Sequence, residues 1–134
     1  MSNKSIKMLV VDDEEGIVDM AKKLFTRRGF ETYVALDGAT AVKIFQEQRP
    51  QINIIDIHLA YSSLDGIDVL KEIKTIDPDA VCIMVTRITD KEKVEKAREL
   101  GALHYITKPL NTNQLIELVQ EAEQLIKHRE DKNG

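Results

Sequence analysis

The sequence predicts an α/β protein in which five parallel strands form one doubly wound sheet, with five helices covering its two faces. Five short apolar runs alternate with five amphipathic stretches along the 134 residues. Strict alternation with connections this short implies a single parallel sheet. Three of the apolar runs are nearly continuous, as expected for parallel strands that are buried on both faces.

The expected strands are the apolar runs themselves. The first, third and fourth are rich in Val and Ile, and we expect them in the interior of the sheet. The second, ETYVAL, is more mixed in polarity, as an edge strand can be. In chain order the five runs are residues 6–11, 31–36, 52–57, 80–85 and 103–106.

The expected helices are the stretches between these runs, where apolar residues recur every three or four positions. Gly29 and Gly101 stop the first and fourth helices, and Pro50 ends the second. The last seven residues, HREDKNG, are polar, and we expect them to be frayed. In chain order the five helical stretches are residues 14–28, 38–48, 66–76, 90–100 and 112–127.

The composition agrees with one globular domain. A chain of 134 residues has the size of an ordinary domain. Apolar residues make up 43% and charged residues 31%, a balance typical of soluble proteins. We expect residues 1–134 to form a single domain, with its core at 5–127 and a short polar tail at 128–134.

Charge and hydropathy argue against several classes of protein. The net charge is −4 without a dense run of Lys or Arg, so we expect no direct binding to nucleic acid. No stretch approaches the roughly 20 apolar residues of a membrane span, and the N-terminal apolar run is too short for a signal peptide. The single cysteine, Cys82, lies in an apolar run and is expected in the core. We therefore expect a cytoplasmic protein with no membrane partner.

Polar residues follow the predicted strands at their carboxyl ends, where open parallel sheets bind their ligands. Asp12 and Asp13 follow the first run, Asp56 lies at the end of the third, Thr86 follows the fourth and Lys108 comes after the fifth. Three carboxylates, a hydroxyl and an ammonium group should therefore converge at one edge. Carboxylates placed together repel one another unless a cation neutralises them, and an all-oxygen site suits Mg²⁺ or Mn²⁺.

Each of these residues also has an ordinary structural interpretation. Asp12 and Asp13 are suitable N-caps for the following helix. Asp56 and Lys108 can form a buried ion pair, or Lys108 can be a surface residue before a loop proline. Thr86 can be a plain strand-end residue. Their coincidence at neighbouring strand ends favours a functional site over these separate explanations.

Four motifs carry a family resemblance: MLVVDDE, PQINIIDI, IMVT and YITKP, at the first, third, fourth and fifth strands. Together they resemble the receiver domains of bacterial two-component response regulators, over roughly residues 5–127. The resemblance implies a flavodoxin-like fold with strand order 2-1-3-4-5. It also implies a signalling domain rather than an enzyme. Such a domain accepts a phosphoryl group from a histidine kinase or phosphotransfer protein and switches conformation to control an output protein or domain.

The resemblance also implies roles for individual residues. Asp56 matches the phosphoacceptor, while Lys108 and Thr86 match the residues that contact the phosphoryl group. Tyr105 matches the aromatic residue that changes rotamer on activation, and the fourth helix, fifth strand and fifth helix match the output surface. The Mg²⁺ site, which also accepts Mn²⁺, is matched by Asp12, Asp13, Asp56 and the main-chain carbonyl of His58. In this match Asp13 is the direct carboxylate ligand, and Asp12 is the acid that usually acts through metal-bound water.

Two departures from the receiver pattern concern the loop after the third strand. The segment from Asp56 to Gly66 is about two residues longer than the common form, and Ala60 stands where a proline is frequent. The path of the loop over residues 57–65 is therefore open.

A third departure is Arg87, which follows Thr86 where a small residue is usual. A guanidinium there can contact phosphoryl oxygens and hinder water from attacking the acyl phosphate, so that Arg87 acts as a phosphate gate. Ile88, the next residue, is apolar and cannot orient an attacking water. Both features predict a phosphoaspartate that hydrolyses slowly. The alternative is that Arg87 points into solvent without effect.

Two other functions fit part of the pattern. A phosphatase with an aspartyl nucleophile typically needs a second acid two residues after Asp56, where this chain has His58. An interaction module that is never phosphorylated is compatible with Arg87 and the longer loop, although the intact set of acids argues against it. Turnover of a generic phosphate ester would support the phosphatase, and failure to be labelled by a small phosphodonor would support the module.

Overall fold

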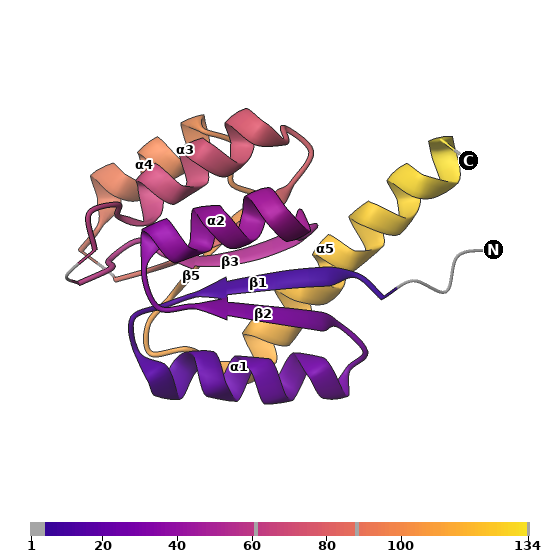
Figure 1. Ribbon diagram of the computed structural model, residues 1–134, viewed down its shortest axis with the longest axis horizontal. Coiled ribbons are helices and arrows are strands. Elements are labelled where there is room, and N and C mark those ends of the chain that lie inside the picture. The colour runs from indigo at the N-terminus through magenta and orange to yellow at the C-terminus, as the bar shows by residue number, and fades with distance from the viewer. Residues whose placement is uncertain (1–4, 61, 88, 134) are drawn as a thin grey trace.

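The computed structural model describes residues 5–60, 62–87 and 89–133. Within them, five strands and five helices alternate strictly, and the strands form one parallel sheet in the order β2-β1-β3-β4-β5 (Figure 1). This arrangement confirms the predicted doubly wound, flavodoxin-like fold. The strands are β1 (Lys7–Val11), β2 (Glu31–Ala35), β3 (Ile52–Asp56), β4 (Val81–Thr86) and β5 (His104–Thr107).

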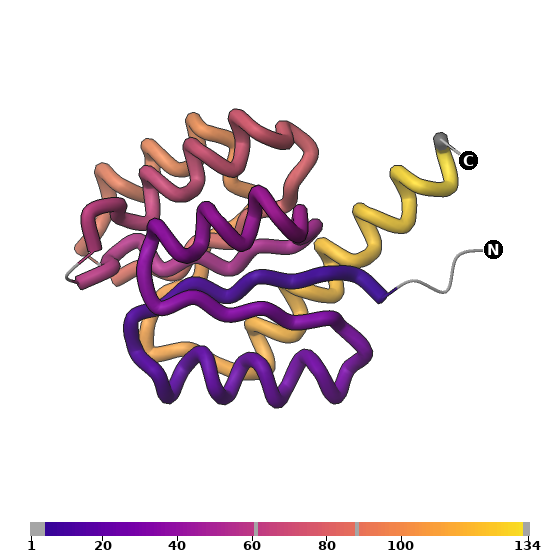
Figure 2. Tube along the Cα trace, in the orientation of Figure 1, coloured from indigo at the N-terminus to yellow at the C-terminus, as the bar shows by residue number. Residues whose placement is uncertain are grey.

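The helices cover both faces of the sheet, as predicted. One face packs against α1 and α5, and the other packs against α2, α3 and α4 (Figures 1 and 2). Gly29 and Gly101 follow the first and fourth helices with φ angles of 94° and 96°, which is how a glycine ends a helix. The helices are α1 (Glu15–Arg27), α2 (Gly38–Gln48), α3 (Gly66–Ile76), α4 (Lys91–Glu99) and α5 (Thr112–Asn133).

The central strands β3 and β4 are buried along their whole length, which explains their continuous apolar sequences. In β4, Ile83 and Val85 pack on the side of α1 and α5, whereas Cys82 and Met84 pack on the opposite side. Cys82 is fully buried, so this cysteine is a core residue, as predicted, and burial raises the pKa of its thiol to about 12. β2 lies at one edge of the sheet, as its mixed polarity indicated, and β5 lies at the other.

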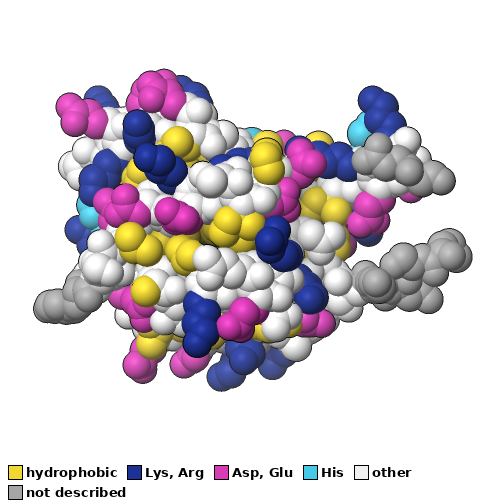
Figure 3. Space-filling view, turned by 45° about the horizontal axis from the view of Figure 1, so that its top comes forward, with side chains coloured by type: hydrophobic (Ala, Val, Ile, Leu, Met, Phe, Trp, Pro, Cys, Tyr) yellow, Lys and Arg dark blue, Asp and Glu magenta, His cyan; other side chains and the backbone are white. Residues whose placement is uncertain are grey.

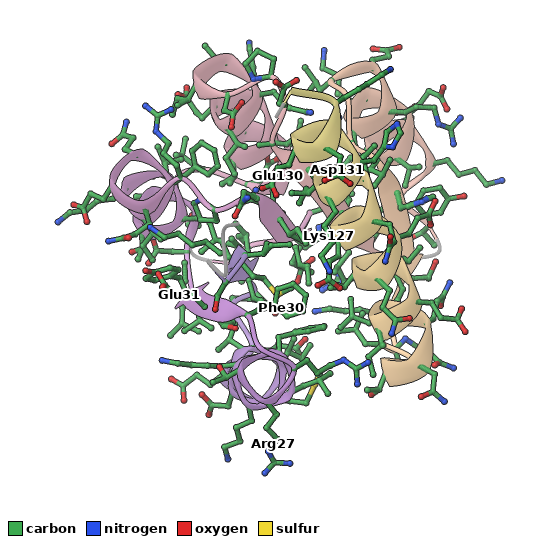
Figure 4. All side chains as sticks on the ribbon, turned by 90° about the vertical axis from the view of Figure 1, so that its right-hand side faces the viewer. Arg27, Phe30, Glu31, Lys127, Glu130 and Asp131 are labelled. Atoms are coloured by element: carbon green, nitrogen blue, oxygen red, sulfur yellow. The ribbon has the colours of Figure 1, made fainter. Side chains whose placement is uncertain are left out.

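The last helix is longer than the sequence predicted. We expected frayed residues after 127, but α5 continues through Asn133, so this expectation was wrong for residues 128–133. Lys127 Nζ lies 3.4 Å from Glu123 Oε2, and Arg129 Nη1 donates a hydrogen bond to the Asp79 carbonyl at 2.8 Å. These polar contacts stabilise a segment that has little apolar surface to bury. Figure 4 shows Lys127, Glu130 and Asp131 on these last turns of α5.

The described surface carries charges of both signs. On the face seen in Figure 3, basic and acidic side chains are interspersed rather than gathered by sign. None of the helices in the described ranges is long and apolar enough to cross a membrane.

Candidate functional site

Three aspartates come together at the carboxyl edge of the sheet, where β1 and β3 end. One carboxylate oxygen from each of Asp12, Asp13 and Asp56 lies within 4.8 Å of the others. The two strands are hydrogen-bonded neighbours, so their ends bring these residues to one point, as predicted. Asp12 is 1% exposed and Asp56 is 3% exposed. Buried carboxylates this close require a compensating cation.

Lys108 supplies one compensating charge. Its Nζ lies 2.6 Å from Glu14 Oε2, 2.9 Å from Asp56 Oδ2 and 3.2 Å from Asp12 Oδ2. The main-chain N–H of Lys108 donates to the Thr86 carbonyl at 2.8 Å, which continues the pairing of β4 with β5 past its last residue. The peptide bond from Lys108 to Pro109 is cis.

The acids around Lys108 keep its side chain protonated. Burial lowers the pKa of Lys108, but hydrogen bonds to Glu14 and Asp56 and the charges of Asp56 and Asp12 outweigh burial and raise the pKa above its ordinary value. We refer to Asp12, Asp13, Glu14, Asp56 and Lys108 as the acid cluster. Within the described residues it holds four carboxylates and one ammonium group, so its acids are not fully neutralised.

The charge imbalance is greatest at Asp12. Its Oδ1 accepts a hydrogen bond from the main-chain N–H of Glu14 at 2.9 Å. Its Oδ2 is buried and has no assigned hydrogen bond among the described residues, although the Lys108 ammonium lies 3.2 Å away as an ion-pair partner. Burial raises the pKa of Asp12 to about 6, and the charge of Asp56 acts in the same direction. A buried carboxylate oxygen in this position, beside two other carboxylates, fits a divalent cation that prefers oxygen ligands.

Asp56 is the last residue of β3, and both of its carboxylate oxygens are engaged. Oδ2 accepts from Lys108, and Oδ1 accepts from the main-chain N–H of His58 at 3.0 Å. Gly66, the first residue of α3, packs directly against its main chain. A Cβ atom at Gly66 would lie 2.1 Å from the Asp56 carbonyl oxygen, so only glycine lets the helix begin there.

The loop between β3 and α3 makes hydrogen bonds to two other segments of the chain, one through Ala60 and one through Ser62. Tyr61, between them, lies outside the described residues. The Ala60 main-chain N–H donates to Asp13 Oδ2 at 3.0 Å. The Ser62 hydroxyl oxygen accepts from the N–H of Gly38, at the start of α2, at 2.9 Å. Proline has no N–H group, so Ala60 makes a contact that a proline at this position cannot make.

A second carboxylate, Asp90, lies at the N-terminus of α4, and it accepts hydrogen bonds from three donors. Its Oδ2 lies 2.7 Å from His58 Nε2, 3.0 Å from Thr86 Oγ1 and 2.9 Å from the main-chain nitrogen of Arg87. Burial raises the pKa of Asp90, but these hydrogen bonds outweigh burial and hold the pKa below its ordinary value. We refer to Asp90, His58, Thr86 and Arg87 as the Asp90 cluster.

Of the predicted switch residues, Thr86 belongs to this cluster and Tyr105 lies beside it. Thr86 is 2% exposed, and no hydrogen bond within the described ranges joins its hydroxyl to Asp56. Tyr105 is half-exposed and borders a hollow of about 430 Å³ between α4 and β5, which Thr86 and Asp90 also line. The structure therefore places Tyr105 and Thr86 next to the same empty volume.

Arg87 also lines this hollow and is exposed. Its guanidinium makes no hydrogen bond or ion pair with any part of the chain that the structure describes. Its predicted role as a phosphate gate stays a prediction, and Ile88, the residue expected not to orient water, lies outside the described residues.

Two residues of the site were missed from the sequence. Glu14 contacts Lys108, and the feature of the sequence that could have indicated this is its position directly after Asp12 and Asp13. Asp90 follows Thr86 by four residues at the start of a helix, a position that capping alone explains.

Three comparisons place this geometry among known proteins. A family model described as "Response regulator receiver domain" matches residues 8–120. Sporulation initiation phosphotransferase F of Bacillus subtilis (strain 168) is 31% identical over 114 residues, which are 85% of this chain and 90% of that protein. Regulatory protein AtoC of Escherichia coli (strain K12) is 34% identical over 119 residues, but the match spans only 25% of AtoC. The crystal structure of the receiver domain of NtrX from Brucella abortus has a TM-score of 0.80 at 33% identity, covering 86% of this chain and 96% of that one.

Proposed function

This chain belongs to the response regulator receiver domain family of two-component signalling, and we propose that it works by accepting a phosphoryl group on Asp56. The observation that carries the proposal is the position of the Asp56 carboxylate. It is buried at a strand end, 2.9 Å from the Lys108 ammonium and beside two further aspartates. A buried nucleophile with a fixed cation at this distance suits phosphoryl transfer, in which catalysis is mainly positioning and charge stabilisation.

In the proposed reaction, a carboxylate oxygen of Asp56 attacks the phosphorus of a phosphohistidine on a histidine kinase or phosphotransfer protein. A new oxygen–phosphorus bond forms as the phosphorus–nitrogen bond breaks, and the electron pair of that bond stays on the imidazole nitrogen. Lys108, held protonated by its acidic neighbours, donates a hydrogen bond to an oxygen of the transferred group. The product is an acyl phosphate on Asp56.

The proposed metal is Mg²⁺, with Mn²⁺ as a substitute. Asp12, Asp13, Asp56 and the main-chain carbonyl of His58 would hold it. When bound, it supplies positive charge that offsets the negative charge of the transferring group. The buried Oδ2 of Asp12 supports this assignment, because no hydrogen bond satisfies it among the described residues and the single Lys108 ammonium, 3.2 Å away, is shared with other acids.

The acyl phosphate would act as a switch through Thr86 and Tyr105. Phosphorylation adds a charge close to −2 and strong acceptor oxygens, one of which the Thr86 hydroxyl can bind. Tyr105 can then enter the hollow that it borders together with Thr86. The face formed by α4, β5 and α5 would present this change to an output protein or domain, as a shift between two pre-existing conformations.

Intact mass after incubation with acetyl phosphate and Mg²⁺ tests the acceptor. Wild type should gain one phosphoryl group and Asp56→Asn none, because the carboxamide is not a nucleophile of comparable strength. Asp19→Asn, which alters an exposed aspartate on α1, is the matched control and should be labelled like wild type. Labelling of Asp56→Asn would refute the assignment, an unlabelled wild type would favour an interaction module, and turnover of a generic phosphate ester would favour a phosphatase.

A further inference from the structure

The Asp90 carboxylate joins two loops that the proposed reaction uses. His58 belongs to the loop after β3, while Thr86 and Arg87 lie where β4 ends. All three contact the same oxygen, Asp90 Oδ2, at 2.7–3.0 Å: His58 through a ring nitrogen, Thr86 through its hydroxyl and Arg87 through its main-chain N–H. The Asp90 side chain is only 10% exposed, so water competes weakly for these contacts.

This arrangement occupies the hydroxyl of Thr86. A threonine hydroxyl has one hydrogen to donate. Two acceptors are within reach, Asp90 Oδ2 at 3.0 Å and the Arg87 carbonyl at 3.2 Å. The charged acceptor at the shorter distance binds more strongly. While the hydroxyl donates to Asp90, it cannot donate to a phosphoryl oxygen on Asp56.

His58 connects the same carboxylate to the phosphorylation site. Its main-chain N–H donates to Asp56 Oδ1 at 3.0 Å, while its ring lies 2.7 Å from Asp90 Oδ2. One residue therefore contacts both the proposed acceptor and the residue that holds Thr86. A shift of the main chain at His58 when Asp56 is modified would move the ring that bonds to Asp90.

We propose that Asp90 is a positioning residue that holds Thr86 in the unphosphorylated conformation, and that His58 links this hold to Asp56. Phosphorylation then offers Thr86 a second charged acceptor, and the two acceptors compete for one hydroxyl hydrogen. The charge of Asp90 sets how strongly the resting state is favoured. This inference rests on the proposed function, because it takes Asp56 as the phosphoacceptor.

The test uses amide NMR shifts of residues 90–120 in the full chain, before and after acetyl phosphate and Mg²⁺. Asp90→Asn retains an acceptor oxygen but loses the charge, so the hold on Thr86 weakens. We expect unphosphorylated Asp90→Asn to shift toward the phosphorylated wild type, with the equilibrium changed about tenfold. In a Thr86→Ala background the same substitution should produce no such shift, because the group that Asp90 holds is gone.

Asp37→Asn is the matched control. Asp37 is the N-cap of α2 and accepts from the hydroxyl of Thr40 at 2.9 Å, so it repeats the chemistry of Asp90 away from the site. It should leave the shifts of residues 90–120 in place. If Asp90→Asn does not fold, Asp90→Ser, which keeps a side-chain oxygen without the charge, should shift in the same direction.

Three results would overturn the proposal. The first is that the amide shifts of Asp90→Asn do not move toward those of the phosphorylated wild type. The second is that Asp90→Asn causes the same shift when Thr86 is already alanine. The third is that Asp37→Asn causes the same shift as Asp90→Asn. Intact mass on the same samples separates this inference from the proposed function. A labelled wild type with an unresponsive Asp90→Asn removes only Asp90, whereas an unlabelled wild type removes the acceptor assignment.

Discussion

The acid cluster and the Asp90 cluster lie at neighbouring strand ends, and their carboxylates differ in how they are hydrogen-bonded. In the acid cluster, a buried oxygen of Asp12 has no hydrogen-bond partner among the described residues, and burial raises the pKa of Asp12 to about 6. In the Asp90 cluster, one oxygen accepts from three donors, whose hydrogen bonds outweigh burial and lower the pKa of Asp90. The first cluster needs a further cation, and the second is already satisfied. This difference agrees with our proposals that the acid cluster carries out the phosphoryl transfer and that Asp90 maintains a conformation.

The largest expected effect is on the free energy of unfolding, which a substitution in the acid cluster should raise and a substitution in the Asp90 cluster should lower. Without metal at pH 7.5, Asp12→Asn should raise the free energy of unfolding by about 2 kcal/mol, because it removes a buried charge whose ionised form is disfavoured. Asp90→Ala should lower it by about 2 kcal/mol, because it leaves the buried Thr86 hydroxyl and two less buried donors without this charged acceptor. Urea unfolding in the presence of a chelator measures both. Changes of the same sign would show that the clusters do not differ in this way.

The next largest effect concerns Arg87, whose main chain belongs to the Asp90 cluster. If its guanidinium reaches the phosphoryl group on Asp56, Arg87→Ala should speed the decay of the phosphorylated protein about tenfold to hundredfold. The decay rate is followed by intact mass. Lys91→Ala, which removes another exposed positive charge from the same hollow, is the control and should decay like wild type. Equal or slower decay in Arg87→Ala would remove this residue from the mechanism.

A third effect is the pH dependence of metal binding. The folded-state pKa of Asp12 is raised to about 6, so protons compete with Mg²⁺ for its carboxylate below that pH. Affinity measured by calorimetric titration should fall about tenfold from pH 7 to pH 5 through this group. In the metal-free protein, the raised pKa stabilises the fold at low pH, and this contribution is lost as the pH rises through about 6. Asp12→Asn should lose this part of the dependence, and an unchanged profile would contradict the assignment.

The smallest effect separates two members of the acid cluster. Asp13→Ala should weaken Mg²⁺ binding several-fold more than Asp12→Ala, since Asp13 matches the direct ligand of receiver domains. Asp13 is also less buried than Asp12, and the described residues give it one hydrogen bond, from Ala60. Metal titration of both variants measures the difference. Equal affinity in wild type and Asp13→Ala would exclude Asp13 as a ligand.

The fold was predictable because its signals are local. Continuous apolar runs identify β3 and β4, and the aspartates at the ends of β1 and β3 meet at one sheet edge. Asp90 was missed because its partners, His58 and Thr86, come together only through the packing of two loops. The extension of α5 was missed because the contact of Arg129 with the Asp79 carbonyl is polar, and hydrophobic periodicity does not indicate such contacts.

The loop after β3 was unpredictable for a related reason. The loop is longer than the common form, so its path cannot be inferred from the shorter loops of other receiver domains. Two hydrogen bonds orient it: the N–H of Gly38 on α2 donates to the Ser62 hydroxyl oxygen, and the N–H of Ala60 donates to the Asp13 carboxylate. Both partners are distant in sequence, so no local pattern indicates them.

The burial of Cys82 makes it useful for spectroscopic work. It is the one cysteine of the chain, it is 0% exposed, and its thiol ionises only at high pH. Thiolate is the reactive form, so alkylating dyes will leave the folded protein unlabelled. A cysteine introduced on α4 can therefore carry a fluorophore without first replacing Cys82. In the unsubstituted chain, the rate of thiol modification will instead report how frequently β4 opens to solvent.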